Sequence, residues 1–185
     1  YEHYCQGGGG KLITIEKDQD RIVYEPAYYG KSSDKEHVFK SHSIYIAELS
    51  DVIVHGGTGL VISGESVITD LCANDTEDRV KYVSGAIRRA NRDIFYLEVE
   101  PEIDNLDCAV NLCGLAASNY YHLTFEILSR YRYVKEYLLD NAIPVLLDEC
   151  TKKFKQFEDL TKCILGDVKV IYVPEYKRIH CSNSW

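Results

Sequence analysis

The last third of the chain alternates short apolar runs with amphipathic stretches, and this alternation limits the possible folds more than any other feature. In chain order the pattern predicts a strand over 107–112, a helix over 119–139, a strand over 144–148, a helix over 153–165 and a strand over 169–173. Strands that alternate with helices form a parallel sheet, and right-handed crossovers place both helices on one face. We therefore expect an α/β protein in which residues 107–185 form a Rossmann-like β-α-β-α-β half.

The preceding residues, 11–106, are expected to form a β-rich segment with one helix. In chain order we expect a hairpin of 12–15 with 21–24, an antiparallel meander over 44–70, a helix over 77–93 and a connector over 94–106. The run Gly7–Gly10 predicts a flexible lead over residues 1–10. The sequence Gly56-Gly57-Thr58-Gly59 lacks the full glycine pattern of a phosphate loop and predicts a β-turn.

Composition excludes several classes of protein. Hydrophobic residues make up 45% of the chain and charged residues 27%, which excludes a disordered or collagen-like chain. The net charge of −8 argues against a nucleic-acid partner, because phosphate binding needs an excess of Lys and Arg. No apolar run is long enough to span a membrane, and no signal peptide is visible.

The seven cysteines have no C-x-x-C spacing, which favours free thiols in a reducing compartment over a zinc site. We therefore expect a cytoplasmic protein, with peripheral association with a membrane left open. We assign no metal ligand and no cofactor.

The long predicted helix holds the strongest candidates for a functional site. A polar stripe along one face of the helix has a residue at every fourth position: His122, Glu126 and Arg130. The helix follows the carboxyl end of a predicted strand, where open α/β sheets bind their ligands. Glu126 could orient the His122 imidazole or act as a base itself. The alternative is an ordinary solvated charge stripe with a histidine at its boundary. Ser118 or Asn119 is the expected N-cap.

The sequence of residues 119–130, Asn-Tyr-Tyr-His-Leu-Thr-Phe-Glu-Ile-Leu-Ser-Arg, resembles the signature of glycosyltransferase family 61. This family includes bacterial capsular-polysaccharide biosynthesis proteins, plant arabinoxylan xylosyltransferases and animal O-linked N-acetylglucosaminyltransferases. The sequence departs from the signature at Leu123, where the family usually has Trp, and at Ser129, where it usually has Pro. The strands expected at 145–148 and 169–173 follow the motif as they do in the family.

The resemblance implies a GT-B architecture of two Rossmann-like lobes and an inverting transfer of a sugar from a nucleotide-sugar donor to a hydroxyl of a glycan acceptor. The chain is then expected to be the N-terminal, acceptor-side portion, with the donor bound mainly by a C-terminal lobe outside these residues. His122 and Glu126 would be catalytic. The implied substrate-binding residues are Asn119, Tyr120, Tyr121 and Arg130.

Two other functions stay open at this point. One is a non-catalytic carbohydrate-binding or scaffold module of the α/β class. The other is a small nucleotide- or flavin-binding α/β protein, since one fold hosts many functions. The absence of a complete G-x-G-x-x-G or Walker loop between a strand and a helix argues against this last possibility.

Overall fold

The structure is a computed structural model that describes residues 1–24, 36–41, 43–68, 86–90 and 94–185, with the backbone alone for Tyr24 and 137–141. Its strands are β1 (Gly10–Glu16), β2 (Gln19–Tyr24), β3 (Glu36–Ser41), β4 (Ile44–His55), β5 (Val61–Ser63), β6 (Ser66–Ile68), β7 (Ile87–Ala90), β8 (Phe95–Leu97), β9 (Ile103–Asn111), β10 (Val145–Asp148), β11 (Val170–Val173) and β12 (Arg178–Ser184).

Its helical elements are α1 (Glu2–Tyr4), the π-helical turn η1 (Cys5–Gly9), the π-helical η2 (His122–Ile127), the 3-10 turn η3 (Leu128–Arg130), α2 (Tyr131–Asn141), the 3-10 turn η4 (Glu149–Lys153) and α3 (Lys155–Leu165). The segments η2, η3 and α2 follow one another without a break. They form the long helix that the apolar spacing predicts, with a local change of winding at each junction.

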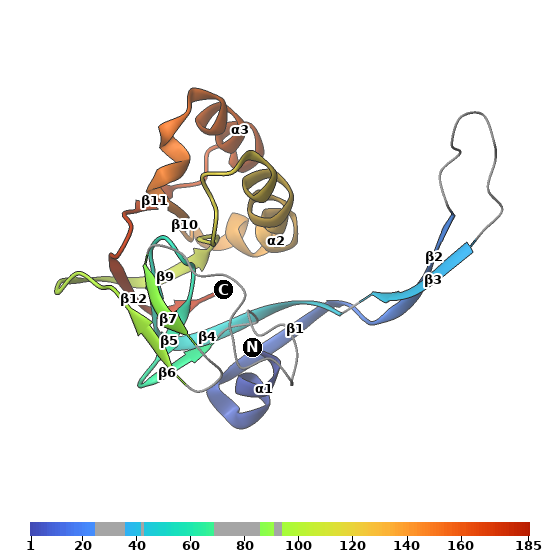
Figure 1. Ribbon diagram of the computed structural model, residues 1–185, viewed down its shortest axis with the longest axis horizontal. Coiled ribbons are helices and arrows are strands. Elements are labelled where there is room, and N and C mark those ends of the chain that lie inside the picture. Colours follow the sequence, from blue (N-terminus) through green and yellow to red (C-terminus); the bar gives the residue numbers. More distant parts are fainter. Residues whose placement is uncertain (25–35, 42, 69–85, 91–93) are drawn as a thin grey trace.

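A mixed sheet forms the centre of the molecule (Figure 1). Its strand order is β11-β10-β9-β12-β4-β5-β6, and β1 pairs with the first half of β4. Strand β9 joins the two halves of the sheet, because residues 103–109 pair with β12 whereas Val110 and Asn111 pair with β10. It also runs across the boundary expected between residues 106 and 107.

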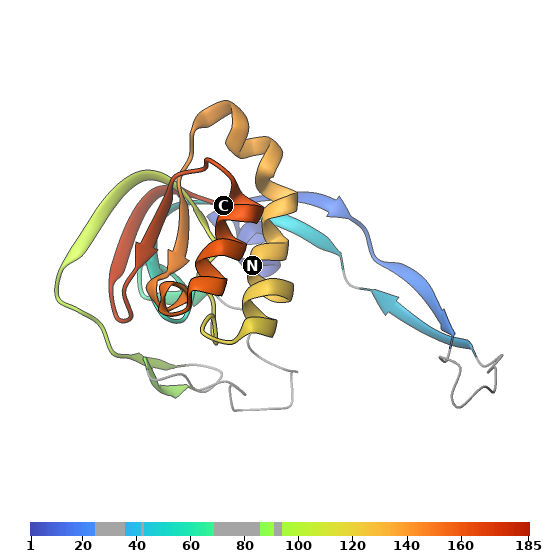
Figure 2. The ribbon, with the colours of Figure 1, turned by 90° about the horizontal axis from the view of Figure 1, so that it is seen from above.

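The prediction of parallel β-α-β units is confirmed. Strands β9, β10 and β11 are parallel neighbours, and α2 and α3 lie side by side on one face of them (Figure 2). Tyr131 of α2 and Phe157 of α3 belong to the same buried cluster as Val145 and Leu147 of β10. Leu146, which points to the opposite face, is buried in a second cluster. A strand that is buried on both faces needs a continuous apolar run, which 145–147 supplies.

The expected hairpin of 12–15 with 21–24 is wrong. Strand β1 pairs with β4, and β2 pairs with β3, so the polar residues between β1 and β2 do not reverse the chain. Instead β2 and β3 extend as a two-stranded ribbon away from the body of the protein (Figures 1 and 2). The partner of β1 lies three strands further along the chain, a separation that periodicity does not encode, whereas β2 pairs with the next strand, β3. The antiparallel meander β4-β5-β6 is confirmed.

Other expectations also change. The glycine-rich lead, expected as a loop, forms the helical turns α1 and η1. Within the helix expected over 77–93, Ile87–Ala90 is strand β7, paired with β8, and most of the rest lies outside the described residues. The expected connector 94–106 contains β8 and the start of β9, and β12 was not expected at all.

The turn between β4 and β5 packs tightly against the carboxyl ends of the parallel strands. A Cβ atom at Gly56 would clash with the Pro174 carbonyl, and one at Gly59 would clash with the Cys113 carbonyl. Gly59 also has a φ of +65°, which favours glycine. The glycines of this turn therefore permit close backbone contact, and the β-turn interpretation of this sequence is confirmed.

Replacement of Gly59 by alanine tests this packing. We expect Gly59→Ala to lower the free energy of unfolding by about 3 kcal/mol, because it adds both backbone strain and a steric clash. Gly64→Ala is the matched control: its φ is +55° but no atom lies within 4 Å of the added Cβ, so only strain of about 1 kcal/mol applies. Urea unfolding measures both, and equal losses would contradict the packing argument.

Candidate functional site

Asp148 lies at the carboxyl end of β10 and ties two loops together. Its Oδ1 accepts a hydrogen bond from the Gly57 backbone N–H at 2.6 Å, and its Oδ2 accepts one from the Gly114 N–H at 2.8 Å. Gly57 belongs to the β4–β5 turn, and Gly114 follows β9. Only 1% of Asp148 is exposed. The carboxylate therefore joins segments that are distant in the sequence, at the edge where parallel sheets bind ligands.

Burial dominates the electrostatics at this edge. It raises the pKa of Asp148 to about 6, although the two backbone N–H donors favour the ionised form and lower the pKa. Burial, reinforced by the nearby Asp148 carboxylate, holds the pKa of the Cys113 thiol well above its usual value. It also raises the pKa of Cys150 to about 11. Both thiols are therefore protonated at neutral pH and are poor nucleophiles.

Sequence reasoning placed Asp148 only as the last residue of a strand. A polar residue directly after a buried apolar run, at the carboxyl edge of a parallel sheet, is the pattern that could have identified it. Because both of its oxygens already accept hydrogen bonds within the protein, Asp148 acts as a brace between loops.

In the described part of the chain no three His, Cys, Asp or Glu side chains are grouped to hold a metal ion.

Asn119 caps the long helix. Its Oδ1 accepts hydrogen bonds from the backbone N–H groups of Tyr121, at 2.9 Å, and of His122, at 3.5 Å. These donors would otherwise have no partner in the first turn of the helix. The expected N-cap is confirmed at Asn119, and its side-chain oxygen is occupied by the helix itself.

His122 and Glu126 form the pair that their spacing predicts. The His122 Nδ1 lies 2.7 Å from the Glu126 Oε2, and both side chains are partly exposed to solvent. A carboxylate only accepts hydrogen bonds, so Nδ1 is the nitrogen that holds a proton. In the neutral ring, Nε2 then carries a lone pair that can accept a proton or a hydrogen bond.

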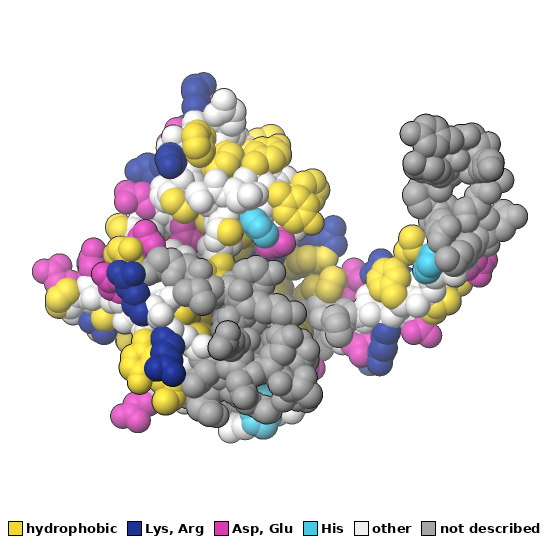
Figure 3. Space-filling view, in the orientation of Figure 1, with side chains coloured by type: hydrophobic (Ala, Val, Ile, Leu, Met, Phe, Trp, Pro, Cys, Tyr) yellow, Lys and Arg dark blue, Asp and Glu magenta, His cyan; other side chains and the backbone are white. Residues whose placement is uncertain are grey.

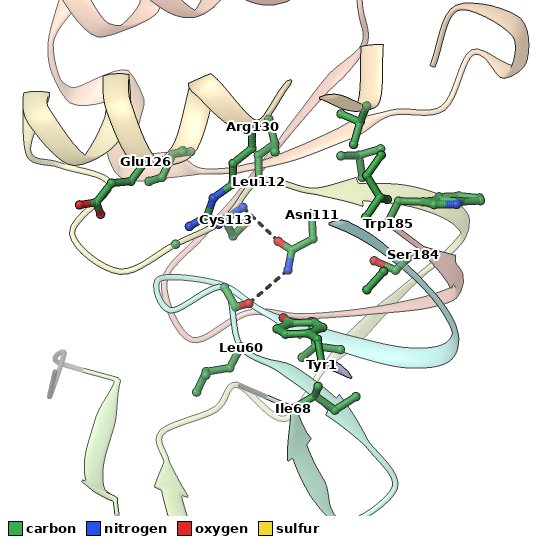
Figure 4. A pocket seen from close by; sticks show the side chains of 18 of the residues that line it. Tyr1, Leu60, Ile68, Asn111, Leu112, Cys113, Glu126, Arg130, Ser184 and Trp185 are labelled. Carbon is green, nitrogen blue, oxygen red and sulfur yellow. Dashed lines mark hydrogen bonds between the residues drawn. The ribbon is translucent and has the colours of Figure 1, made fainter. Parts of the chain in front are cut away.

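A large cavity opens beside this pair, between the long helix and the central sheet (Figure 4). Its volume is about 770 Å³, and its lining includes His122, Glu126 and Arg130. The rest of its wall is mostly apolar and includes Ile46, Leu60, Leu112, Ile127, Val134 and Trp185. An apolar cavity with a few convergent polar groups is the usual form of a small-molecule site. The structure thus brings three of the six expected site residues to one cavity.

Arg130 and Asn111 differ in whether their polar side-chain groups have partners in the described part of the chain. Arg130 extends from its helix toward Leu112 and Cys113 (Figure 4) and has no ion-pair partner among the described residues. Asn111, which sequence reasoning missed, donates to the Gly59 carbonyl at 3.1 Å and accepts from the Cys113 N–H at 3.0 Å. Asn111 therefore fixes the cavity wall, whereas the Arg130 guanidinium is available for a negatively charged ligand.

The other three expected site residues lie elsewhere. Asn119 caps the helix, and Tyr120 and Tyr121 point outward at the molecular surface, outside the lining of the cavity. Tyr121 contacts the His122 ring edge-on, with ring centroids 5.6 Å apart. The two tyrosines therefore adjoin the His122–Glu126 pair without lining the cavity.

Comparisons of this chain with protein-family models, with curated proteins and with solved structures found no match. Within the residues that the structure describes, no helix is long and apolar enough to cross a membrane.

The pKa of Asp148 leads to a prediction about stability and pH. Since this pKa is about 6 in the folded protein, against an ordinary value of 3.8, the folded state binds a proton more tightly than the unfolded state. The stability contributed by this group should therefore increase as the pH falls. Relative to Asp148→Asn, we expect the unfolding free energy of the wild type to rise by roughly 2 to 3 kcal/mol between about pH 7 and pH 4.

Chemical denaturation at a series of pH values measures this difference. The control is Asp159→Asn, which removes a carboxylate that is exposed on α3, so that no buried charge is lost with it. A difference between the wild type and Asp148→Asn that is constant across this range would contradict the assigned pKa.

Proposed function

We propose that this chain is the acceptor-side lobe of a glycosyltransferase that moves a sugar from a nucleotide-sugar donor to a hydroxyl of a glycan, with inversion, in polysaccharide biosynthesis. The observation that supports this most directly is the 2.7 Å contact between His122 Nδ1 and Glu126 Oε2 beside the cavity. The resemblance of residues 119–130 to glycosyltransferase family 61 supports the same function. In this proposal β9, β10 and β11 with α2 and α3 are the Rossmann-like part of one GT-B lobe.

The proposed mechanism follows from the hydrogen bond between the two side chains. An inverting transfer needs a base to remove the proton of the acceptor hydroxyl as its oxygen attacks the anomeric carbon. The lone pair of His122 Nε2 would take this proton. Glu126 would keep the proton on Nδ1, fix the orientation of the ring, and stabilise the imidazolium that forms.

Arg130 would supply positive charge on the same face of the helix. The leaving group of a nucleotide sugar is a nucleoside diphosphate or monophosphate, which gains negative charge as the glycosidic bond breaks. A guanidinium without an ion-pair partner among the described residues suits this charge, because it can donate two parallel hydrogen bonds to phosphate oxygens. Most contacts with the donor would come from a second lobe.

The remaining expected residues would act indirectly or at the surface. Asn119 is a positioning residue, since it caps the helix turn that holds His122. Tyr120 and Tyr121 would contact parts of the acceptor that lie outside the cavity. A non-catalytic carbohydrate-binding module remains the alternative: it would use the same exposed tyrosines but would transfer no sugar.

Substitutions at the pair test the catalytic role in the full-length gene product. We expect His122→Ala to lower kcat for sugar transfer by about 100-fold or more, because the general base is lost. Glu126→Gln should lower it less, by about tenfold, because an amide oxygen can still accept from Nδ1 but does not stabilise an imidazolium. The measurement is product formation from nucleotide sugars and oligosaccharide acceptors.

His180 provides a matched control, since its Nε2 lies 2.8 Å from Asp51 Oδ1 in another histidine–carboxylate pair, outside the cavity lining. His180→Ala should leave turnover unchanged. Near-normal turnover in folded His122→Ala and Glu126→Gln proteins would rule out the catalytic assignment. Oligosaccharide binding without any transfer by the wild type would favour the non-catalytic module.

A further inference from the structure

Exposed aromatic side chains gather at the start of the two helices that cover the parallel strands. Tyr120, Tyr121 and Phe125 lie at the start of the long helix and are 55%, 58% and 62% exposed. Phe154, just before α3, is 45% exposed. Figure 3 shows hydrophobic side chains over these helices next to a histidine and an acidic side chain. We call these four residues, with Phe157 beneath them, the aromatic platform.

The rings of the platform form two groups of contacting side chains. Tyr121 and Phe125 have ring centroids 5.1 Å apart, and Phe157 lies 6.0 Å from Tyr120 and 5.2 Å from Phe154. Phe157 is only 7% exposed and belongs to the main buried cluster, so it anchors Tyr120 and Phe154 to the core. Through Phe157 one group therefore joins Tyr120 of the long helix to Phe154 at the start of α3, whereas Tyr121 and Phe125 form the second group on the long helix.

A group of exposed aromatic side chains is unusual on a surface that contacts only water. Single exposed apolar residues are common, but several large exposed aromatic side chains at neighbouring helix starts mark a binding surface. Aromatic rings have few rotatable bonds, so holding them in place on binding costs little conformational entropy. A preformed platform of this kind suits a ligand with flat apolar faces and polar edges.

The position of the platform indicates which ligand it serves. Tyr121 contacts the His122 ring edge-on, so the Tyr121–Phe125 group of the platform adjoins the proposed catalytic pair. We propose that the aromatic platform binds a neutral glycan chain, by stacking pyranose rings on Tyr120, Phe125 and Phe154, and so directs the end of the acceptor to His122. This inference rests on the proposed function and adds to it a binding surface for acceptor units outside the cavity.

The charges nearby favour a glycan over a membrane surface. Lys152 lies 3.9 Å from Glu149, and Lys155 lies 3.3 Å from Asp159, so two of the three nearby lysines are ion-paired. The third, Lys153, lies over the Phe154 ring at 5.7 Å. Binding to an anionic bilayer needs a cluster of unpaired basic side chains, and the chain as a whole has a net charge of −8. A neutral, hydroxyl-rich ligand is not repelled by the net negative charge of the chain.

Titration with neutral hexasaccharides tests the platform directly. The probes are cellohexaose, xylohexaose, mannohexaose and maltohexaose, and the affinity of the purified protein for each is measured by calorimetry. We expect at least one to bind, and we expect Phe125→Ala and Phe154→Ala each to weaken that binding about tenfold, the effect of losing one ring contact. Phe125→Tyr and Phe154→Tyr, which keep the ring, should bind within about twofold of the wild type.

Phe39→Ala is the matched control, since Phe39 is 47% exposed but lies on the β2–β3 ribbon. It should leave binding unchanged. Failure of the wild type to bind any hexasaccharide, or equal losses in Phe39→Ala and Phe154→Ala, would overturn the proposal. The platform would be assigned to a membrane instead if the wild type bound vesicles of mixed phosphatidylcholine and phosphatidylglycerol but no sugar, and if Phe125→Ala lost the binding to vesicles.

The same variants separate this inference from the proposed function. If His122→Ala abolishes transfer while Phe125→Ala and Phe154→Ala bind and use the acceptor normally, the platform fails and the catalytic assignment stands. If the platform binds glycans but the wild type transfers no sugar, the platform stands and the glycosyltransferase proposal fails.

Discussion

The carboxylate of Asp148 is the interaction on which the arrangement of the site depends. It lies at the end of a strand that is buried on both faces, and it bonds the β4–β5 turn through Gly57 and the loop after β9 through Gly114. Without it, two partly buried backbone N–H groups would lose their acceptor, which lowers stability. The loop that Asp148 holds at Gly114 leads directly into the helix of His122. Asp148 thus helps to set the position of the catalytic candidates without contacting them.

The glycines of the β4–β5 turn make this bond possible. Gly57 brings its N–H within 2.6 Å of the carboxylate, and its neighbours Gly56 and Gly59 allow the turn to touch the backbone at Pro174 and Cys113. Asn111 then links the same two regions through its side-chain amide. The antiparallel half of the sheet is therefore fastened to the carboxyl edge of the parallel half, and the cavity lies between this joint and the long helix.

Local patterns in the sequence were sufficient for the parallel half and for the His122–Glu126 pair. Strands 145–148 and 170–173 and their helices follow from apolar runs and helical spacing, and a histidine and a glutamate four residues apart meet on any helix. Pairing between distant segments could not be predicted this way. Three features join residues that no short-range periodicity in the sequence relates. They are the pairing of β1 and β2 with their partners, the insertion of β12 beside β9, and the bond from Asp148 to Gly57. The exposure of Phe125 and Phe154 likewise depends on which helix faces meet the sheet.

The carboxylates of Asp148 and Glu126 have opposite environments, and this difference divides their proposed roles. Asp148 is buried, and each of its oxygens accepts a hydrogen bond from a backbone N–H, so the carboxylate is held by the two loops. Glu126 is partly exposed, and its bond to His122 leaves the rest of the carboxylate open to solvent. A proton-transfer site needs groups that can reach a substrate and change charge with little rearrangement. Of the two, the Glu126 carboxylate, acting through His122, fits the proposed proton transfer, whereas Asp148 holds the two loops in place.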